Sequence, residues 1–498
     1  MYFLGIDLGS SSVKLSVLNT EKGIAVATVS VPEFEMDIMA PKFGWAEQNP
    51  EDWWEYVKKG IKLLDTKHQI KLKEIVAIGI AYQMHGLVLT DEIGNSVRNS
   101  IIWCDSRAAS IGDFAYDKIG HENCQEQILG SPGNFTASKL KWVQQNEPEV
   151  FNKAVYMMLP GDFIAAKLSK KPQISTSGLS EAALWNFKKG ALATEILEAM
   201  GLPENMIPEI VSNFGFQAQV HPDIAQELGL NPNTQITYRA GDQPNNALSL
   251  NVLKPGEIAT TAGTSAVIYA VSDKDIYDKQ NRINTFSHVN NTATDKHNGV
   301  MLCINGSGIL YQWLRKIMST DRPELIGYEK LNTEAAKVAA GSEGLRFYPF
   351  GNGVERIFNN KNANSGIQNL NFNMHQSSHL VRSACEGIVF AMNYGFDVMK
   401  SVGASGEIVR SGNANLFLSP VFREIFTNTT QTTLELYNTS GAEGAARGAA
   451  YGYGYYKSLD QAFEGLKCIE RIEPKQELMT QYQDIYQEWR NHIKLELY

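Results

Sequence analysis

Two aspartates come directly after apolar segments and before small polar residues, a pattern that can place a carboxylate beside a ligand. The first, Asp7, follows the apolar run 3–6 and precedes Gly9 and three serines, and a second apolar run covers 13–18. Short side chains there let backbone N–H groups and hydroxyls approach a phosphate, and an acid beside phosphates commonly acts through Mg²⁺. No P-loop pattern occurs, and a strand rather than a helix follows the turn, so a dinucleotide-binding turn is not predicted. A tight β-hairpin with a capping aspartate also explains these residues.

The second aspartate, Asp242, follows a predicted strand and precedes a predicted helix. It can be the N-cap of that helix, which is a common role for aspartate. It can instead be a carboxylate that points into a cleft at the junction of the two halves of the chain, where ligand sites tend to form. The neighbouring Gln243, Asn245 and Asn246 add the donors and acceptors that a polyol requires.

A third group combines Gln83, Met84 and His85 with the stretch 103–107, which reads Trp-Cys-Asp-Ser-Arg. The first three residues lie between predicted strands, which places them at a sheet edge or a loop mouth. An aromatic residue with His, Asp and Arg suits a sugar. The same set can also form a hydrogen-bonded polar core, and a lone histidine is more often structural than catalytic.

Glycine-rich stretches recur in the second half of the chain. The segment 256–273 is again a strand, a Gly-Thr-Ser turn and a strand, which predicts a duplicated architecture with one phosphate-facing hairpin in each half. Residues 305–314 open a helix with small residues suited to phosphate or ribose. Residues 409–428 contain a Ser-Gly-Asn-Ala-Asn loop that can lie under a purine or be a plain connection. The small residues of 441–454 predict a helix packed tightly against a neighbour.

The length and composition of the chain limit the classes of protein to which it can belong. Strand patterns alternate with helix patterns, which indicates an α/β protein, and 498 residues predict two large domains. With 45 basic and 54 acidic residues, the net charge is -9, and no run of Lys or Arg suggests nucleic acid or an anionic membrane as partner. No signal peptide or membrane span is predicted. Five cysteines without a CxxC pair indicate reduced thiols in a cytoplasm, without zinc or disulfides. The Asn-rich stretch 359–373 is predicted to be a surface loop.

Together and in this order, the motifs resemble the FGGY family of carbohydrate kinases over nearly the whole chain. "GIDLGSSSVK" looks like the first phosphate hairpin of the family, "AGDQ" its catalytic-base segment, "TTAGTS" its second hairpin and "RSGNAN" its adenine-side loop. "TASKLKWVQQN" (136–146) matches most of the first family signature, and "QMHG" with "WCDSR" is similar to the xylulokinase branch. Asn134 departs from the first signature, and Cys385 with the preceding Asn-rich loop departs from the second.

This resemblance implies two actin/Hsp70-like (ribonuclease H-like) ATPase domains with a cleft between them. Residues 1–238 would form the N-terminal domain, with the sugar side and the first phosphate hairpin. Residues 239–498 would form the C-terminal domain on the nucleotide side, and the last helix could pack back on the first domain.

The resemblance further implies transfer of phosphate from ATP, with Mg²⁺, to the 5-hydroxyl of D-xylulose. Alternatives are another FGGY substrate (ribulose, rhamnulose, gluconate or glycerol), an actin/Hsp70-like ATPase with protein partners, or a sugar sensor without catalysis. The expected partners are the sugar and ATP, without nucleic acid or membrane, and a homodimer is compatible. The implied catalytic residues are Asp242, as base, and Asp7, which also holds the metal; the sugar contacts are Gln83, Met84, His85, Trp103, Asp105, Gln243 and Asn246; and the nucleotide contacts are Ser10, Ser11, Ser12, Lys14, Gly263, Thr264, Ser265, Gly306, Ser307, Gly412, Asn413 and Asn415.

Overall fold

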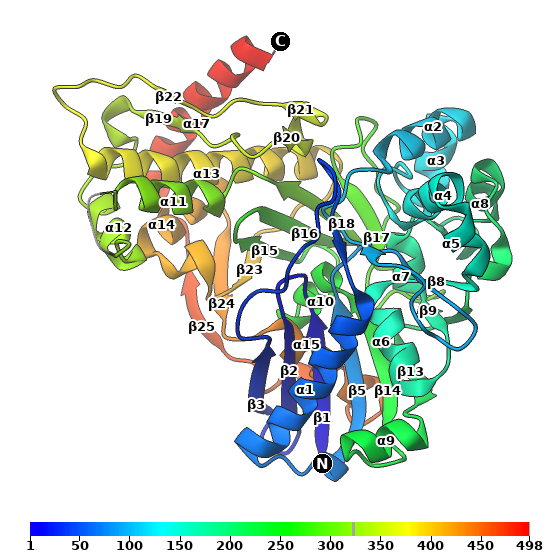
Figure 1. Ribbon diagram of the computed structural model, residues 1–498. Helices are drawn as coiled ribbons and strands as arrows, with labels where there is room; N and C mark the ends of the chain where they lie inside the picture. Colours follow the sequence, from blue (N-terminus) through cyan, green and yellow to red (C-terminus); the bar gives the residue numbers. More distant parts are fainter. Residues whose placement is uncertain (321–323, 498) are drawn as a thin grey trace.

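The apolar runs of the opening segment form the centre of a six-stranded sheet with the strand order β13-β14-β5-β1-β2-β3 (Figure 1). The computed structural model describes residues 1–320 and 324–497. β2 is antiparallel to β1, whereas β5 is parallel to β1 and β14 is parallel to β5. The carboxyl ends of β1, β5 and β14 therefore meet at one edge of the sheet. The strands are β1 (Tyr2–Leu8), β2 (Val13–Asn19), β3 (Ile24–Val31), β5 (Ile75–Tyr82), β13 (Phe214–Gln219) and β14 (Gln235–Gly241).

A second sheet repeats this arrangement with the order β17-β18-β16-β15-β23-β24-β25. β15 and β16 form an antiparallel hairpin, and β23 and β24 continue the sheet in parallel beyond β15, as β5 and β14 do beyond β1. The predicted α/β fold with a duplicated hairpin is confirmed. The strands are β15 (Ile258–Ala262), β16 (Ala266–Ser272), β17 (Asn284–Ser287), β18 (Asn298–Ile304), β23 (Ile408–Gly412), β24 (Thr433–Tyr437) and β25 (Cys468–Ile472).

Helices cover both faces of the first sheet. Leu4, Ile6 and Leu8 of β1 share a core with Trp53 of α1 (Pro50–His68), and Phe3 lies on the opposite face, in a core with alanines of α15 (Gly441–Gly452). Two glycines of the sheet allow α15 to approach closely, since a Cβ at Gly5 or Gly79 would collide with the backbone of that helix. The small-residue helix predicted at 441–454 is thus packed directly on the strands.

The second sheet is covered by α13 (Ser377–Ser401), with α14 (Pro420–Thr430) and α17 (Gln476–Leu497) packed around it (Figure 1). Trp489 of α17 donates to the carbonyl of Phe347 at 2.9 Å, within the core of the second domain. The last helix therefore packs on the second domain, which corrects its predicted return to the first; α15 is the helix that returns. The division of the chain between residues 238 and 239 stays a prediction.

The remaining segments complete the two lobes. The predicted loop 359–373 carries two short strands, β21 (Lys361–Asn362) and β22 (Gly366–Gln368), which pair with β20 (Val354–Glu355) and β19 (Arg346–Tyr348). None of the helices in the described residues is long and apolar enough to cross a membrane. Further helices are α2 (Ala109–Ile119), α3 (His121–Ile128), α4 (Thr136–Asn146), α5 (Pro148–Lys153), α6 (Pro160–Ser169), α7 (Thr176–Glu181), α8 (Thr194–Met200), α9 (Pro222–Leu228), α10 (Asp242–Ser249), α11 (Gly308–Ile317), α12 (Tyr328–Ala335) and α16 (Leu459–Phe463).

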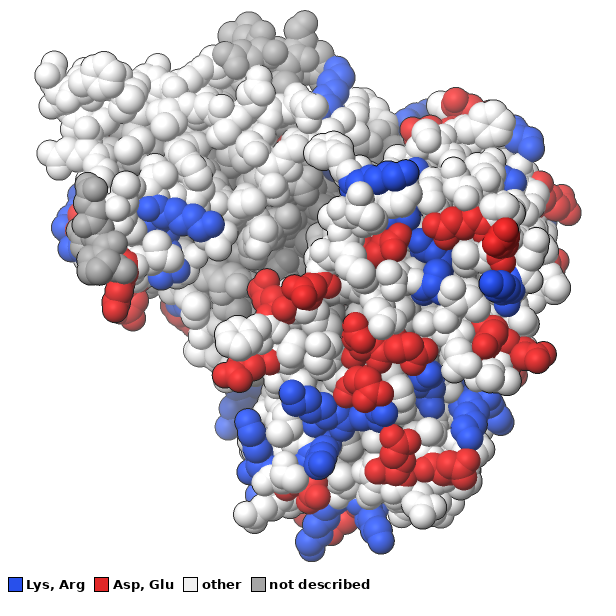
Figure 2. Space-filling view, viewed as in Figure 1, with Lys and Arg blue, Asp and Glu red and all other residues white. Residues whose placement is uncertain are grey.

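Figure 2 shows the face of the molecule that is hollowed between the two lobes. Lys and Arg side chains alternate with Asp and Glu over the lower lobe, and no patch of a single sign covers this face.

Candidate active site

The carboxyl ends of three parallel strands bring three predicted motifs to one edge of the first sheet. Asp7 of β1 is in register with Ala81 of β5, which is in register with Ala240 of β14. The segment 83–85 follows the end of β5, and Asp242 follows the end of β14. Residues far apart in the sequence therefore face the same edge, as ligand-binding groups do in α/β proteins.

Asp7 is half-buried beside the N-terminus of α15. A Cβ at Gly441 would collide with its carboxylate, so the small residue at that position leaves room for the acid. Asn245 lies nearby and donates its amide to the carbonyl of Gly441 at 2.9 Å. Burial raises the pKa of Asp7, and the charge of Lys14, its cross-strand neighbour, partly opposes that shift.

Asp242 is the first helical residue of α10, and Gly241 rather than Asp242 occupies the N-cap position. Burial and then the charge of Asp7 raise the pKa of Asp242 to about 7, against the opposing effect of hydrogen bonding from Gln243. A carboxylate with a pKa near neutral pH is suited to general-base chemistry. Asn246 follows one turn later and is half-buried like Gln243, so all three side chains lie near the start of α10.

The charges of Asp7 and Asp242 repel each other, which a cation between them would offset. Two carboxylates fit part of the oxygen ligand set of Mg²⁺, whose other ligands in kinases are phosphate oxygens and water. Among the described residues, no group of three or more His, Cys, Asp or Glu side chains could hold a metal ion without such additional ligands.

His85 adopts a left-handed backbone conformation with φ 59°. Its Nδ1 donates to the carbonyl of Glu181 at 2.9 Å, which leaves Nε2 as an acceptor. Burial and then the charge of Lys139 lower the pKa of His85 to about 3, so the ring is neutral at pH 7. Lys139 in turn donates to the carbonyls of His85 and Ile102 at 2.8 and 2.9 Å and holds the turn in place.

The second domain contacts the His85 turn through an apolar face. The His85 ring lies 5.4 Å from the ring of Phe286 on β17, and 4.5 Å from the ring of Phe135 in its own domain, measured between centroids. Met84 is buried in a cluster with Phe286 and Met301, so its side chain packs between the domains. The predicted sugar motif thus lies where the two lobes meet.

Glu181 is a buried acid that our sequence analysis did not identify. Glu181 is 1% exposed, and the Tyr82 hydroxyl lies close enough to its carboxyl to oppose part of the effect of burial on its pKa. Burial holds the pKa of Glu181 well above its usual range, with a further contribution from the charge of Asp242. The carboxyl lies close to Gly241, the residue before the candidate base. No sequence motif surrounds it, so only its burial reveals it.

Asp105, a predicted sugar contact, is enclosed by protein groups. Its carboxylate binds Arg107 at 2.6 Å and accepts the backbone N–H of Ala46, also at 2.6 Å. The guanidinium of Arg107 lies 3.8 Å from the ring of Trp45. These contacts favour the alternative in which the 103–107 stretch belongs to a hydrogen-bonded polar core.

The turn of the first hairpin is held by a chain of side-chain contacts. The Gln48 amide donates to the carbonyl of Ser10 at 2.7 Å, and the buried Gln83 donates to Gln48 at 3.1 Å. Trp103, which is 52% exposed, approaches the Ser10 hydroxyl at 3.4 Å. Gln83 and Trp103 therefore contact the hairpin that the sequence assigns to phosphate. Ser10 and Ser12 are half-buried, whereas Ser11 and Lys14 are exposed.

The corresponding turn of the second hairpin borders a cavity of about 340 Å³. Gly308 donates to the carbonyl of Gly263 at 2.9 Å, so the start of α11 is fixed to this turn. The rings of Tyr311 and Tyr328 stack with centroids 5.9 Å apart, and both line the cavity. Our sequence analysis missed these tyrosines, because Tyr311 lies one turn inside the helix whose first residues were chosen and Tyr328 follows no motif. The predicted residues that line the cavity are Gly263, Thr264 and Asn415.

The other predicted nucleotide residues lie at the margins of this region. The backbone N–H of Gly306 donates to Glu355 at 2.8 Å, and the neighbouring Ser307 is buried. Asn413 accepts from Arg423 at 2.9 Å, and its backbone N–H donates to the carbonyl of Tyr437. These contacts fix the loops. Ser265 lies in the turn between β15 and β16, and Gly412 ends β23.

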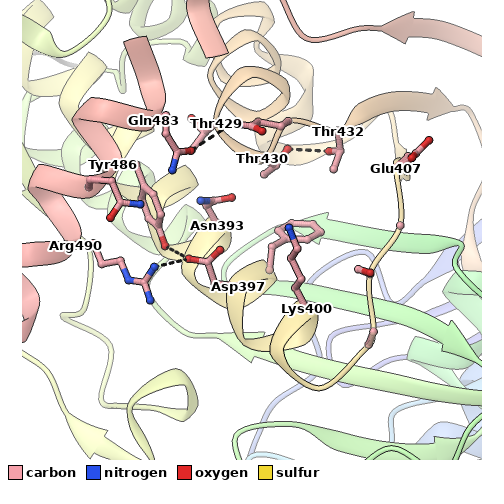
Figure 3. A pocket seen from close by; sticks show the side chains of 16 residues that line it. Asn393, Asp397, Lys400, Glu407, Thr429, Thr430, Thr432, Gln483, Tyr486 and Arg490 are labelled. Atoms are coloured by element: carbon pink, nitrogen blue, oxygen red, sulfur yellow. Dashed lines mark hydrogen bonds and ion pairs between the residues drawn. The ribbon is translucent and has the colours of Figure 1, made fainter. Parts of the chain in front are cut away.

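A larger cavity, of about 640 Å³, lies elsewhere in the second domain, between α13, α14 and α17 (Figure 3). Asp397 on its wall accepts from Tyr486 at 2.7 Å and from Arg490 at 3.1 Å. Glu407 and Thr432, which line it, precede β23 and β24, so the cavity lies at the amino ends of these strands. The predicted nucleotide loops lie at the carboxyl ends, and no predicted site residue lines this cavity.

Comparison with known proteins finds the same family along most of the chain. The model of the N-terminal domain of the FGGY family of carbohydrate kinases matches residues 2–249, and that of its C-terminal domain matches residues 258–454.

Individual relatives differ in the sugar that their names give. A xylulose kinase of Bacillus subtilis is 26% identical over 98% of this chain and 96% of its own, and a gluconokinase of Bacillus licheniformis is 25% identical over 97% and 94%. The crystal structure of a ligand-bound xylulose kinase from Lactobacillus acidophilus superposes with a TM-score of 0.88 at 22% identity, covering 100% of this chain and 99% of that one.

Proposed function

We propose that this chain, which belongs to the FGGY family of carbohydrate kinases and is an ATP-dependent sugar kinase, phosphorylates D-xylulose at its 5-hydroxyl. The observation that carries the proposal is the placement of Asp242 beside Asp7 and the 83–85 turn at one sheet edge. In this arrangement a sugar held at the turn would present a hydroxyl to the carboxylate of Asp242.

Asp242 would accept the proton of that hydroxyl while its oxygen bonds to phosphorus. Its pKa of about 7 leaves a large fraction of the carboxylate ionised at neutral pH and still basic enough to take a proton. Asp7 would hold Mg²⁺, which when bound neutralises charge on the β- and γ-phosphates. The His85 Nε2, kept unprotonated, would accept from another hydroxyl of the sugar.

The two hairpin turns would bind the phosphates. The turns at 10–12 and 263–265 offer backbone N–H groups and hydroxyls, and the second of them borders the cavity lined by Tyr311 and Tyr328. An aromatic wall of this kind suits a purine base. Because water competes for the phosphoryl group, we expect the lobes to close further when sugar binds.

D-Xylulose is favoured by the "QMHG" segment and by the relatives named xylulose kinase, although a gluconokinase relative has nearly the same identity. A coupled assay of ADP release with a panel of ketoses, aldonates and polyols tests this choice. D-Xylulose should give the highest kcat/KM. A higher value for gluconate, ribulose, rhamnulose or glycerol would replace the substrate and leave the family unchanged.

Other expectations rest on the sequence alone. The roles of the individual site residues, the use of Mg²⁺, the cytoplasmic location and a homodimer remain predictions.

A further inference from the structure

Arg356 is a half-buried cation of the second domain. Its Nε donates to the carbonyl of Asn281 at 3.2 Å, and its Nη2 donates to Oδ1 of Asn284 at 2.6 Å. Among the residues that the structure describes, no carboxylate forms an ion pair with this guanidinium, although most other buried arginines of the chain have one. Burial lowers the pKa of Arg356, and the charges of Cys303 and Asp278 oppose part of that shift. A cation in this position gains most from a ligand that supplies oxygen acceptors.

The face that carries Arg356 looks toward the sugar turn of the first domain. Asn284, which holds the guanidinium, and Phe286 lie two residues apart on β17 and so share one face of the sheet. The ring of Phe286 contacts the ring of His85, and Phe286 also packs with Met84. The guanidinium is near enough to this turn for its charge to contribute to the lowered pKa of His85.

Glu355, the residue before Arg356, connects the Arg356 segment to the loop beside the second hairpin. The carboxylate of Glu355 is buried and accepts the backbone N–H groups of Asn305 and Gly306 at 3.0 and 2.8 Å. The same loop leads into Gly308, which is bonded to the turn of the second hairpin. Arg356 therefore follows directly after a residue that anchors the loop beside the proposed nucleotide site.

We propose that Arg356 determines substrate specificity by reading the end of the sugar opposite to the reacting hydroxyl, with two N–H groups of its guanidinium donated to the C1 and C2 oxygens of an open-chain 2-ketose. This inference rests on the proposed function. Nε and one N–H of Nη2 already bind Asn281 and Asn284, so the donors left are the N–H groups of Nη1 and the second one of Nη2. The Nη1 and Nη2 donors have a fixed spacing that fits two adjacent oxygens such as those of an α-hydroxyketone. A polyol offers no carbonyl oxygen at C2 and should use this contact less well.

The test compares D-xylulose with D-arabinitol, which has a hydroxyl where the ketose has its carbonyl. In Arg356→Gln we expect kcat/KM for D-xylulose to fall about 10- to 100-fold, as for loss of hydrogen bonds from a charged group. The value for D-arabinitol should change by less than about threefold, so the ketose preference collapses. Arg356→Lys keeps the positive charge and loses the pair of guanidinium donors. Its ratio of kcat/KM for D-xylulose to that for D-arabinitol should be less than half of the wild-type ratio.

Arg490→Gln is the matched control, because Arg490 pairs with Asp397 at the remote cavity of Figure 3. It should match the wild type with both acceptors. Equal losses with both acceptors in Arg356→Gln, or no loss with either, would overturn the inference. If the Gln variant is unstable, Arg356→Lys with a melting temperature like that of the wild type provides the comparison.

Failure of the proposed function gives a different result. If the wild type does not phosphorylate D-xylulose, the proposed substrate is wrong. The same two variants are then compared on the acceptor that the panel identifies. A tenfold or larger loss in Arg356→Gln alone upholds Arg356 as a substrate-binding residue, and its absence overturns that role.

Discussion

The two hairpins of this protein have the same topology and different chemistry at their turns. Two residues before the turn glycine, the first hairpin has Asp7 and the second has Thr261. The neighbouring parallel strands continue the difference, because the first sheet leads to His85 and Asp242, whereas the second leads to the uncharged loop 412–415. Groups that can move a proton or hold a metal therefore lie on one sheet, and neutral groups that can cradle a nucleotide lie on the other.

The two domains also differ in what their buried and cavity-lining groups can do. On the first sheet, burial brings the pKa of Asp242 to about 7 and keeps His85 neutral, so it prepares groups for chemistry. The turn of the second sheet instead borders a cavity that is lined by two stacked tyrosines, one from α11 and one from α12. Substitutions on the first sheet should thus lower turnover, whereas those on the second should weaken nucleotide binding.

The largest effect is expected for Asp242→Asn. Asparagine preserves the shape and hydrogen bonding of the side chain and cannot accept the proton, so kcat should fall about 10²- to 10⁴-fold at saturating ATP and sugar. ATP affinity and the melting temperature should match the wild type. Asp460→Asn, at an exposed aspartate paired with Lys254, is the control. A kcat like that of the wild type in Asp242→Asn would remove this residue from the mechanism.

The equivalent positions of the two hairpins provide the second test. Asp7→Ala should raise the Mg²⁺ concentration needed for half-maximal ADP release by about 10- to 100-fold, the usual cost of losing a metal-site group. Thr261→Ala should leave this concentration unchanged, because the second hairpin has no acid. Equal shifts in both variants, or full wild-type activity in excess EDTA, would contradict the assignment of the metal to the first hairpin.

His85→Ala should lower kcat/KM for the sugar about tenfold, which corresponds to the loss of one good hydrogen bond at a buried site. The KM for ATP should not change, since His85 lies on the sugar side of the first sheet. Steady-state kinetics with each substrate varied in turn separates the two values. An increase confined to the KM for ATP would place His85 at the nucleotide site instead of the sugar site.

The smallest effect on kinetics is expected for a substitution at the cavity of the second domain. Tyr328→Ala removes one of the two stacked rings and should raise the KM for ATP about 2- to 10-fold, the size of one aromatic contact. The KM for the sugar and kcat at saturating ATP should remain at their wild-type values. If the sugar KM changes instead, the cavity beside Gly263 is not the purine site.

The sequence was sufficient to predict the repeated strand–turn–strand units and the positions of Asp7 and Asp242 at the ends of strands, because each follows an apolar strand and precedes small residues. Asp105 is enclosed because its partner Arg107 follows in the same short stretch and forms an ion pair with it, a pairing that the sequence pattern does not specify. Glu181 and Arg356 could not be predicted, because their significance depends on which distant segments do or do not supply a partner. The position of the last helix also depends on tertiary packing against α13 and α14, which its own amphipathic pattern does not specify.

The most direct test of the account is the pH dependence of kcat/KM for the wild type and Asp242→Asn between about pH 5 and 9. Because the pKa of Asp242 is raised to about 7, the base is protonated below that pH, and the wild-type value should fall with a slope of one as the pH is lowered. His85, with a pKa of about 3, does not titrate there, but Lys139, whose pKa burial lowers to about 7, does. The account predicts that the acid limb disappears in Asp242→Asn. An acid limb of the same slope and position in the variant would contradict the assignment of Asp242 as the base.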